Sequence, residues 1–219
     1  MARIAALATL IATAAGAPAL AQTAWIAAPT AADLAAAYPA KARAEGIGGG
    51  VQLTCAANRK GEMTDCAVLG ESPRGYGFGA AARRLAEKLQ ASGVVNGQEL
   101  QVPITFMPEM AKGAPVTVKT PHWTALPSVA DMQAAAPKTE GGPNQVRVTL
   151  VCEVRAGGDL SGCVVDREEP AGQGFGPAIL TLAPKFKADL MSVEGAPTVG
   201  AKVRVPVRFD LKPVQQAAK

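Results

Sequence analysis

The sequence has little of what several common functions require. It contains one histidine, His122, in 219 residues, which excludes most Ser-His, Cys-His and histidine-metal chemistry. Aromatic residues make up only 4% of the chain, so we expect small units whose cores consist of Ala, Val, Leu and Ile. The formal charge is +4 without a run of five like charges, which argues against a nucleic-acid partner. These absences favour a binding or structural protein over an enzyme, with no metal and no other cofactor.

The first 21 residues differ from everything that follows. A short positive start precedes the uncharged apolar run 4–15, and Ala-Leu-Ala at 19–21 forms a small-x-small cleavage pattern. We therefore expect a signal peptide over 1–21 and a periplasmic location. The alternative is an uncleaved membrane anchor. Gly16 and Pro18 interrupt the run before the roughly 20 apolar residues that a spanning helix needs, so no stable anchor is expected.

The remaining chain contains two copies of one unit. Trp25 matches Trp123 at an offset of 98, and Cys55 matches Cys152 at an offset of 97. The pattern Val-Pro-x-x-Phe recurs at an offset of 103, because six extra residues fall in a loop around 192–200. We expect domains at 22–107 and 123–213, a Pro- and Gly-containing linker at 108–122 and a short tail at 214–219.

Each copy has the pattern strand, strand, helix, strand. Two alternating segments flank a turn at Lys60-Gly61, and two more flank Gly157-Gly158. A helical stripe follows each hairpin: Phe78, Ala82, Leu85 and Leu89 in the first copy, and Phe175, Ile179, Leu182 and Phe186 in the second. Pro184 falls inside the second helix and should kink or shorten it.

The last strand of each copy alternates strictly between apolar and polar residues and contains a proline, Pro103 or Pro206. A proline within a strand indicates a sheet edge. A right-handed crossover then places this strand antiparallel beside the first strand of the hairpin. The predicted fold class is α+β, with two tandem small units, each a three-stranded antiparallel sheet of order 2-1-3 with a helix packed on one face.

The cysteines give the strongest chemical signal. A turn at Lys60-Gly61 sets Cys55 opposite Cys66 and Leu53 opposite Val68, and the turn in the second copy sets Cys152 opposite Cys163 and Leu150 opposite Val165. Behind a secretory signal, this spacing favours the disulfides Cys55–Cys66 and Cys152–Cys163 among three connectivities. A redox or zinc site would instead need closely spaced C-x-x-C pairs.

Three weaker features have alternative interpretations. Glycine-rich loops at 75–79 and 172–176 precede helices, so a phosphate cradle is one interpretation, but tight strand-to-helix turns fit the spacing better. His122 is expected to be a solvated linker residue. Trp25 and Trp123 are expected to cover the core of each copy rather than to stack on a ligand.

Several segments of the first copy together resemble a known family. They are Tyr38 to Gly46, a Gly-Val strand, a Gly-containing turn, Val68 to Ser72, Ala80 to Leu85 and Val102 to Phe106. In this order they resemble the C-terminal domain of TonB-type energy transducers over about 32–107 and, more weakly, over 129–211. The resemblance implies a periplasmic α+β domain that binds a short extended segment of outer-membrane receptors against its last strand.

Two functions follow from these observations. The first is a periplasmic module that captures an extended peptide or envelope protein by edge-strand addition. Its candidate partner-binding residues are Gln101, Val102, Pro103, Ile104, Thr105 and Phe106, with Arg204 and Arg208 at the matching strand of the second copy, where a more acidic segment is expected. The alternative is a structural or assembly protein whose edges are covered by the other domain, by 108–118 or by a second copy of the chain.

Overall fold

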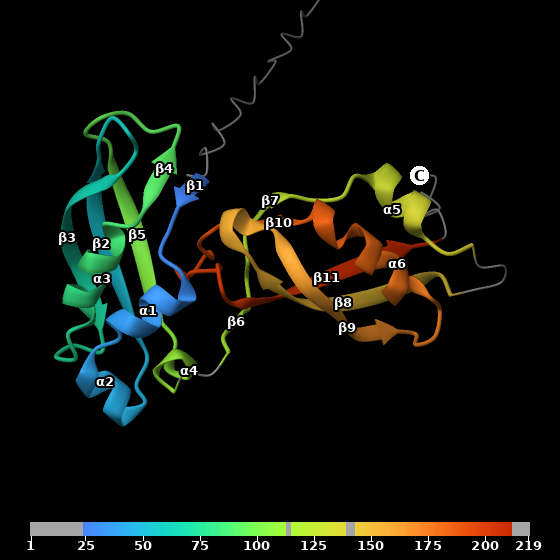
Figure 1. Ribbon diagram of the computed structural model, residues 1–219, viewed down its shortest axis with the longest axis horizontal. Helices are drawn as coiled ribbons and strands as arrows, with labels where there is room; N and C mark the ends of the chain where they lie inside the picture. Colours follow the sequence, from blue (N-terminus) through green and yellow to red (C-terminus); the bar gives the residue numbers. More distant parts are fainter. Residues whose placement is uncertain (1–23, 113–114, 139–142, 212–219) are drawn as a thin grey trace, which may run out of the picture.

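The computed structural model describes residues 24–112, 115–138 and 143–211. We call residues 24–112 the first half and 115–211 the second half. Figure 1 shows the two halves side by side, the first in blue to green and the second in yellow to red. Each half combines one main β-sheet with helices, so the α+β fold class is confirmed.

The first half has nine elements. They are β1 (Ala24–Ala27), α1 (Ala31–Ala37), α2 (Ala40–Glu45), β2 (Gly49–Ala57), β3 (Met63–Ser72), α3 (Phe78–Ala86), β4 (Gln90–Ser92), β5 (Glu99–Phe106) and α4 (Pro108–Ala111). Its main sheet has the order β3-β2-β5 with antiparallel neighbours. This is the predicted 2-1-3 order.

The second half has the same main strands and central helix, with β6 added and with no counterpart of α2 or α4 among its described residues. Its elements are β6 (Thr117–Val118), β7 (Trp123–Ala125), α5 (Val129–Ala135), β8 (Gln145–Val154), η1 (Ala156–Gly158), β9 (Leu160–Glu169), α6 (Phe175–Leu182), η2 (Ala183–Lys185), β10 (Lys187–Ala188) and β11 (Lys202–Asp210). The main sheet has the order β6-β11-β8-β9, so the prediction of three antiparallel strands is wrong for this half. The fourth strand, β6, is parallel to β11.

Strand β6 comes from the segment expected to be a linker. The N–H of Lys202 donates to the carbonyl of Val116 at 2.7 Å, which satisfies a backbone group at the outer edge of β11. Earlier in the same segment, α4 packs against α1 and α2. Met110 and Val118 are buried. The described residues of this segment, 108–112 and 115–122, are therefore packed against the helices of the first half and the sheet of the second.

Both hairpins have the predicted register at their centres. Leu53 lies opposite Val68, and Leu150 lies opposite Val165. Irregularities on either side of these pairs shift the register by one residue. Within the hairpins, Cys55 bonds to Cys66 and Cys152 to Cys163, and the described residues include no free cysteine. The predicted disulfide pairing is confirmed.

A turn glycine in each hairpin sits close to the strand after the helix. Gly61 has φ +81° and Gly158 has φ +88°, and a Cβ there would lie 1.9 Å from the carbonyl oxygen of Ala91 or 2.0 Å from that of Ala188. No side chain fits at such distances, and positive φ also favours glycine. The turn of each hairpin therefore packs directly against the backbone of the strand after the helix, β4 or β10.

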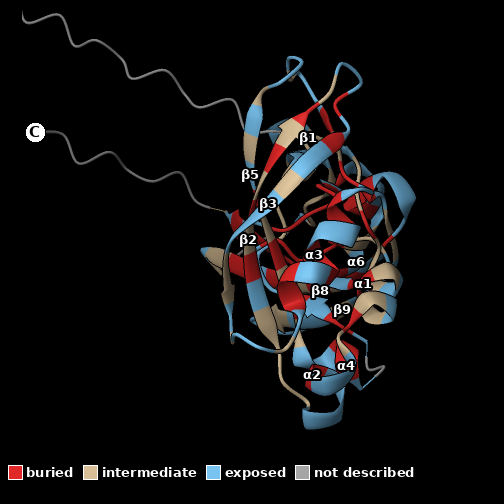
Figure 2. Ribbon diagram, turned by 90° about the vertical axis from the view of Figure 1, so that its left-hand side faces the viewer, coloured by how far each residue is buried: buried red, intermediate tan, exposed pale blue. Residues whose placement is uncertain are grey.

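The predicted helical stripes form the core of each half. Phe78 and Phe175 are fully buried, as are Ala82 and Ile179. Helix α6 ends at Leu182, and Pro184 lies in the 3-10 turn η2, so the predicted shortening is confirmed. Figure 2 looks at the first half and shows the buried residues in red.

Two predictions lie outside the described residues, namely the signal peptide at 1–21 and the tail at 214–219. Across the ranges that the structure does describe, no helix is long and apolar enough to cross a membrane.

Candidate functional site

The outer edge of β5 is the candidate site. Val102, Ile104 and Phe106 are 0%, 0% and 1% exposed, so their side chains lie in the core. Gln101, Pro103 and Thr105 alternate with them on the opposite face. In an antiparallel strand the backbone groups alternate in the same way between the two edges. The N–H of Thr105 points away from β2, so the backbone of Gln101 does as well.

The six-residue insertion of the second half meets this edge. The N–H of Thr105 donates to the carbonyl of Gly195 at 2.9 Å, and its hydroxyl donates to the carbonyl of Glu194. Gly195 has φ +81°, and a Cβ there would lie 2.1 Å from the carbonyl oxygen of Pro103. Nearby, the N–H of Ala31 donates to the carbonyl of Val199 at 2.9 Å. The loop around 192–200 therefore covers one end of the β5 edge.

The other end of the edge is open. Within the described residues, the N–H of Gln101 has no backbone partner outside the sheet pairing. Gln101 and Glu99 are exposed. Pro103 cannot donate a hydrogen bond. The open part of the edge therefore runs from Glu99 to Pro103 and offers one central pair of backbone groups, at Gln101.

A cavity of about 480 Å³ adjoins the covered end. It lies between the end of β5, α4, β6 and the insertion loop, and its lining includes the apolar side chains of Met107, Val116 and Ala196. Because segments of both halves line it, its shape depends on the contact between Thr105 and Gly195.

The edge of β11 in the second half is occupied at one end by β6, which pairs with Lys202 and Val203. Arg204 and Arg208 lie further along and are exposed. Arg204 forms an ion pair with Asp166 at 3.2 Å, and Arg208 with Asp210 at 2.8 Å. Both predicted arginines are thus on the outer face of the sheet, each beside a carboxylate.

The glycine-rich loops have a different role from phosphate binding. The N–H of Gly79 donates to Glu71 at 2.5 Å, and the N–H of Phe175 donates to Glu168 at 2.9 Å. In both halves a carboxylate of the preceding strand therefore takes the place where an anion would bind at a helix N-terminus. This favours the interpretation as strand-to-helix turns.

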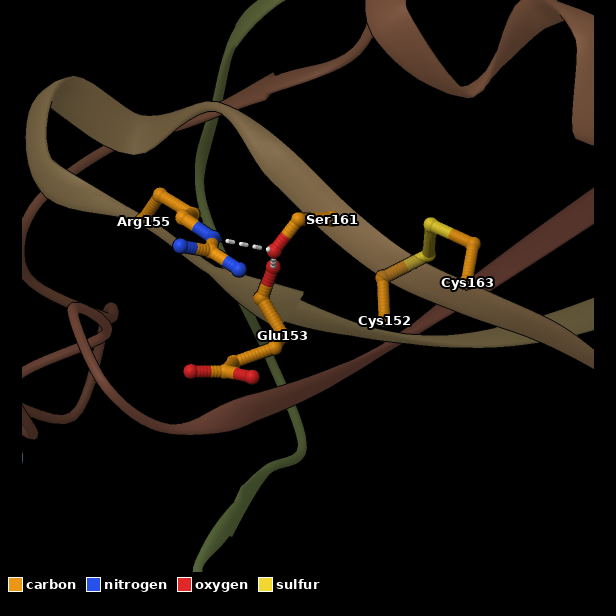
Figure 3. The surroundings of a disulfide bond; sticks show 5 residues. All are labelled: Cys152, Glu153, Arg155, Ser161 and Cys163. Carbon is orange, nitrogen blue, oxygen red and sulfur yellow. Dashed lines mark hydrogen bonds between the residues drawn. A yellow bond between two sulfur atoms is a disulfide. The ribbon is translucent and has the colours of Figure 1, made fainter.

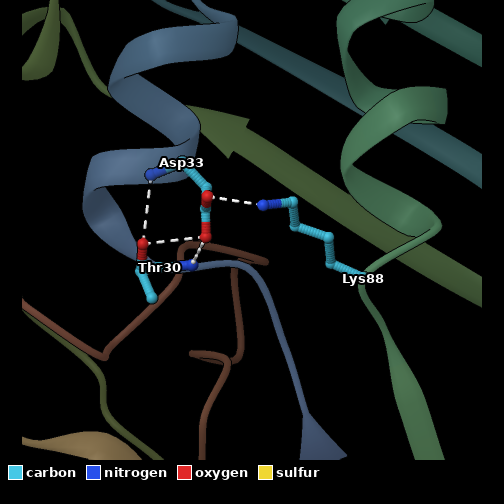
Figure 4. A network of polar contacts seen from close by, with 3 residues as sticks. All are labelled: Thr30, Asp33 and Lys88. Atoms are coloured by element: carbon cyan, nitrogen blue, oxygen red, sulfur yellow. Dashed lines mark hydrogen bonds and ion pairs between the residues drawn. The ribbon is translucent and has the colours of Figure 1, made fainter.

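A polar network that the sequence analysis missed is present in both halves. In the first half Asp33 accepts hydrogen bonds from the N–H and hydroxyl of Thr30 and pairs with Lys88 at 2.6 Å (Figure 4). The ammonium of Lys88 and the Thr30 cap lower the pKa of Asp33. The sequence pattern that could have revealed this network is a Thr or Ser three residues before an Asp at the start of an apolar run, which is typical of a helix capping box.

In the second half, Ser128, Asp131 and Lys185 form the same network, with Lys185 at 2.6 Å from Asp131. The hydrogen bond from Lys185 and those from Ser128 lower the pKa of Asp131 to about 2. In each half the network joins the N-terminus of one helix, α1 or α5, to the segment just after the central helix, α3 or α6.

The single histidine is not isolated. His122 Nδ1 lies 3.9 Å from Asp189 Oδ2, and burial raises the pKa of Asp189. A separation of 67 residues hid this contact from the sequence. Trp123 packs edge-on against Phe186, with ring centroids 5.7 Å apart, as expected for a cover on the core. The described part of the chain holds no group of three or more His, Cys, Asp or Glu suited to a metal.

The Cys152–Cys163 disulfide spans the hairpin of β8 and β9. Figure 3 shows Arg155 and Ser161 beside it, toward the turn. Arg155 donates to the hydroxyl of Ser161 at 2.8 Å. The disulfide and this side-chain contact hold the end of the hairpin in a structural role.

Residues 35–108 match the family model described as the Gram-negative bacterial TonB protein C-terminal. The matched segment includes all of α2, β2, β3, α3, β4 and β5. An uncharacterized protein of Caulobacter vibrioides is 33% identical over 63 residues, which are 29% of this chain and 63% of that protein. The chain therefore spans less than two thirds of that relative. The matched family is one of protein-interaction domains, and the match covers one copy.

Proposed function

We propose that this protein is an exported, periplasmic protein-binding module whose first half captures an extended segment by strand addition to β5. The family match supports this, because it extends through β5 to residue 108. The observation that carries the proposal is the outward-facing backbone of Gln101, which has no partner among the described residues. Such groups template a further strand.

The proposed binding segment is Glu99 to Pro103. Pro103 has no N–H to donate, and Gly195 lies against its carbonyl oxygen, so the added strand gains few backbone hydrogen bonds. Specificity then falls to the side chains beside the edge, above all the amide of Gln101, which both donates and accepts. We infer that the partner is a protein of the cell envelope, with an outer-membrane receptor as the leading class.

We also propose that the two halves are tandem domains, at 22–107 and 123–213, and that the second is a divergent copy. The repeated sheet order, disulfides and polar networks support this. A structural or assembly role is the second candidate. The contact of Gly195 with Thr105 and the addition of β6 to β11 favour it, because both cover edges from within the chain.

Gln101→Pro tests the first proposal, since it removes the outward N–H without touching a hydrogen bond inside the molecule. The probe is an array of peptides from periplasm-facing segments of the outer-membrane receptors of the source bacterium, followed by anisotropy titration of the strongest binder. We expect Gln101→Pro to lose binding. Gln101→Ala, which keeps the N–H but removes the side-chain amide, should still bind but should discriminate less between peptides. Equal binding by Gln101→Pro and the native protein would refute strand addition at this edge.

A further inference from the structure

The open face of each main sheet carries a shallow pocket at the same place. In the first half it has a volume of about 450 Å³ and is lined by residues that include Gly50, Gly70 and Thr105. In the second half it has a volume of about 410 Å³ and is lined by residues that include Arg147, Arg167 and Arg208.

The two pockets correspond residue by residue. Gly50 lies opposite Thr105 in one sheet, just as Arg147 lies opposite Arg208 in the other. In the next row, Gly70 lies opposite Gln52 as Arg167 lies opposite Thr149. At one position on each of the three strands, the second half thus has an arginine where the first half has a small uncharged residue. We call this second pocket the arginine pocket.

The arginine pocket is not neutralised by its own lining. One carboxylate, Glu169, lines it, and this group pairs with Arg167. Arg208 pairs with Asp210 on its own strand. In the part of the chain that the structure describes, no carboxylate lies within ion-pair distance of Arg147. Arg147 lies directly opposite Arg208 on one side and Glu169 on the other. With Asp210 counted beside Arg208, three arginines face two carboxylates, so the pocket keeps an excess of one positive charge.

From this geometry we propose that the arginine pocket binds the side-chain carboxylates of an acidic, extended peptide. Arginine binds carboxylates in a planar, two-point geometry. Pro206 and Arg208 belong to the edge strand β11, whose pairing with β6 ends at Val203. An extended chain beside β11 can therefore use the outward backbone of Arg208 and place a carboxylate in the pocket.

The inference rests on the proposed function in one respect, that the partner is an extended peptide. The two proposals concern different halves of the molecule and different residues, and only the arginine pocket requires a ligand with carboxylates. The corresponding pocket of the first half is lined by no arginine, so the two halves would select different segments of partners.

The test uses two fluorescent peptides, one alternating Glu with Val and one alternating Gln with Val, titrated against the full chain. We expect the Glu peptide to bind about tenfold more tightly or better, as hydrogen bonds to charged groups predict. Arg147→Gln should abolish that preference and Arg147→Lys should restore part of it. Lys202→Gln, which removes an equal charge on the same face of β11 outside the pocket, should leave the preference intact.

Arg147→Gln has no ion pair to lose, so its urea midpoint should match the native value, which separates lost binding from lost folding. Equal affinity for the two peptides would overturn the proposal. So would displacement of the Glu peptide by inorganic phosphate at equal concentration, which would assign the pocket to phosphate. Gln101→Pro is titrated with both peptides in parallel. If the native protein binds the two peptides equally and Gln101→Pro binds neither, the proposed function stands and the proposal for the arginine pocket fails.

Discussion

The backbone N–H of Thr105, on the edge strand of the first half, donates to the carbonyl of Gly195 in the 192–200 loop of the second half at 2.9 Å. The loop around 192–200, which has six residues more than the corresponding segment of the first half, thus contacts the strand where a partner is expected. This contact leaves only the segment from Glu99 to Pro103 open. It therefore ties the relative placement of the halves to the size of the candidate site.

Gly195→Ala should open this contact. A Cβ at this position would lie 2.1 Å from a backbone oxygen of Pro103, so the loop must move away from β5. We expect faster hydrogen exchange at the amide of Thr105 and faster proteolysis within 192–200. Gly97→Ala is the matched control, because Gly97 also has positive φ but nothing lies within 4 Å of its Cβ position. Unchanged exchange at Thr105 would mean that the contact is not formed in solution.

Asp131→Asn should lower stability at neutral pH, because Asp131 pairs with Lys185. The pKa of Asp131 is lowered to about 2 from an ordinary value of 3.8. A lowered pKa means that the contribution is complete above the ordinary pKa and is lost as the pH falls through the lowered one. The difference in urea midpoint between native protein and variant should therefore shrink between about 3.8 and about 2.

Asp33→Asn provides the matched measurement in the first half, where the pKa is lowered in the same direction. Both differences should also decrease at high salt, since these groups are solvent-accessible. A difference for either variant that stays constant across this pH range would show that the carboxylate acts through packing rather than through charge.

Replacing both Cys55 and Cys66 by alanine should lower the free energy of unfolding by about 2 to 3 kcal/mol, as expected for closing a loop this short. The bond joins residues 11 apart in the sequence, and the other disulfide has the same separation. The corresponding double variant of Cys152 and Cys163 should cost a similar amount. Urea unfolding measures both, and peptide mapping without reduction checks the pairing. Recovery of Cys55 linked to Cys152 would contradict the assignment.

The exported protein should begin at Gln22. The Ala-Leu-Ala pattern at 19–21 and the interrupted apolar run predict cleavage there. Intact mass of the protein from a periplasmic fraction measures this directly. A product that keeps Met1 and sediments with membranes would favour an anchored transducer instead.

The sequence alone determined the local structure of both halves. Alternation with period two placed Val102, Ile104 and Phe106 in the core, and the helical spacing placed Phe78 and Leu85 there. The cysteine pairing was predicted correctly because the two cysteines of each disulfide face each other across a short hairpin. These features depend only on residues close together in the sequence or joined by one turn, so the periodicity of the sequence is enough to predict them.

Only the tertiary structure decided how the edges are used. Nothing in the local pattern of Gly195 shows that it meets Thr105, and Val116 gave no sign that it would extend the sheet beside Lys202. The arginines at 147, 167 and 208 lie on three strands, so only the register brings them into one pocket. Contacts between segments distant in the sequence depend on the combined packing of many side chains, which no periodicity encodes.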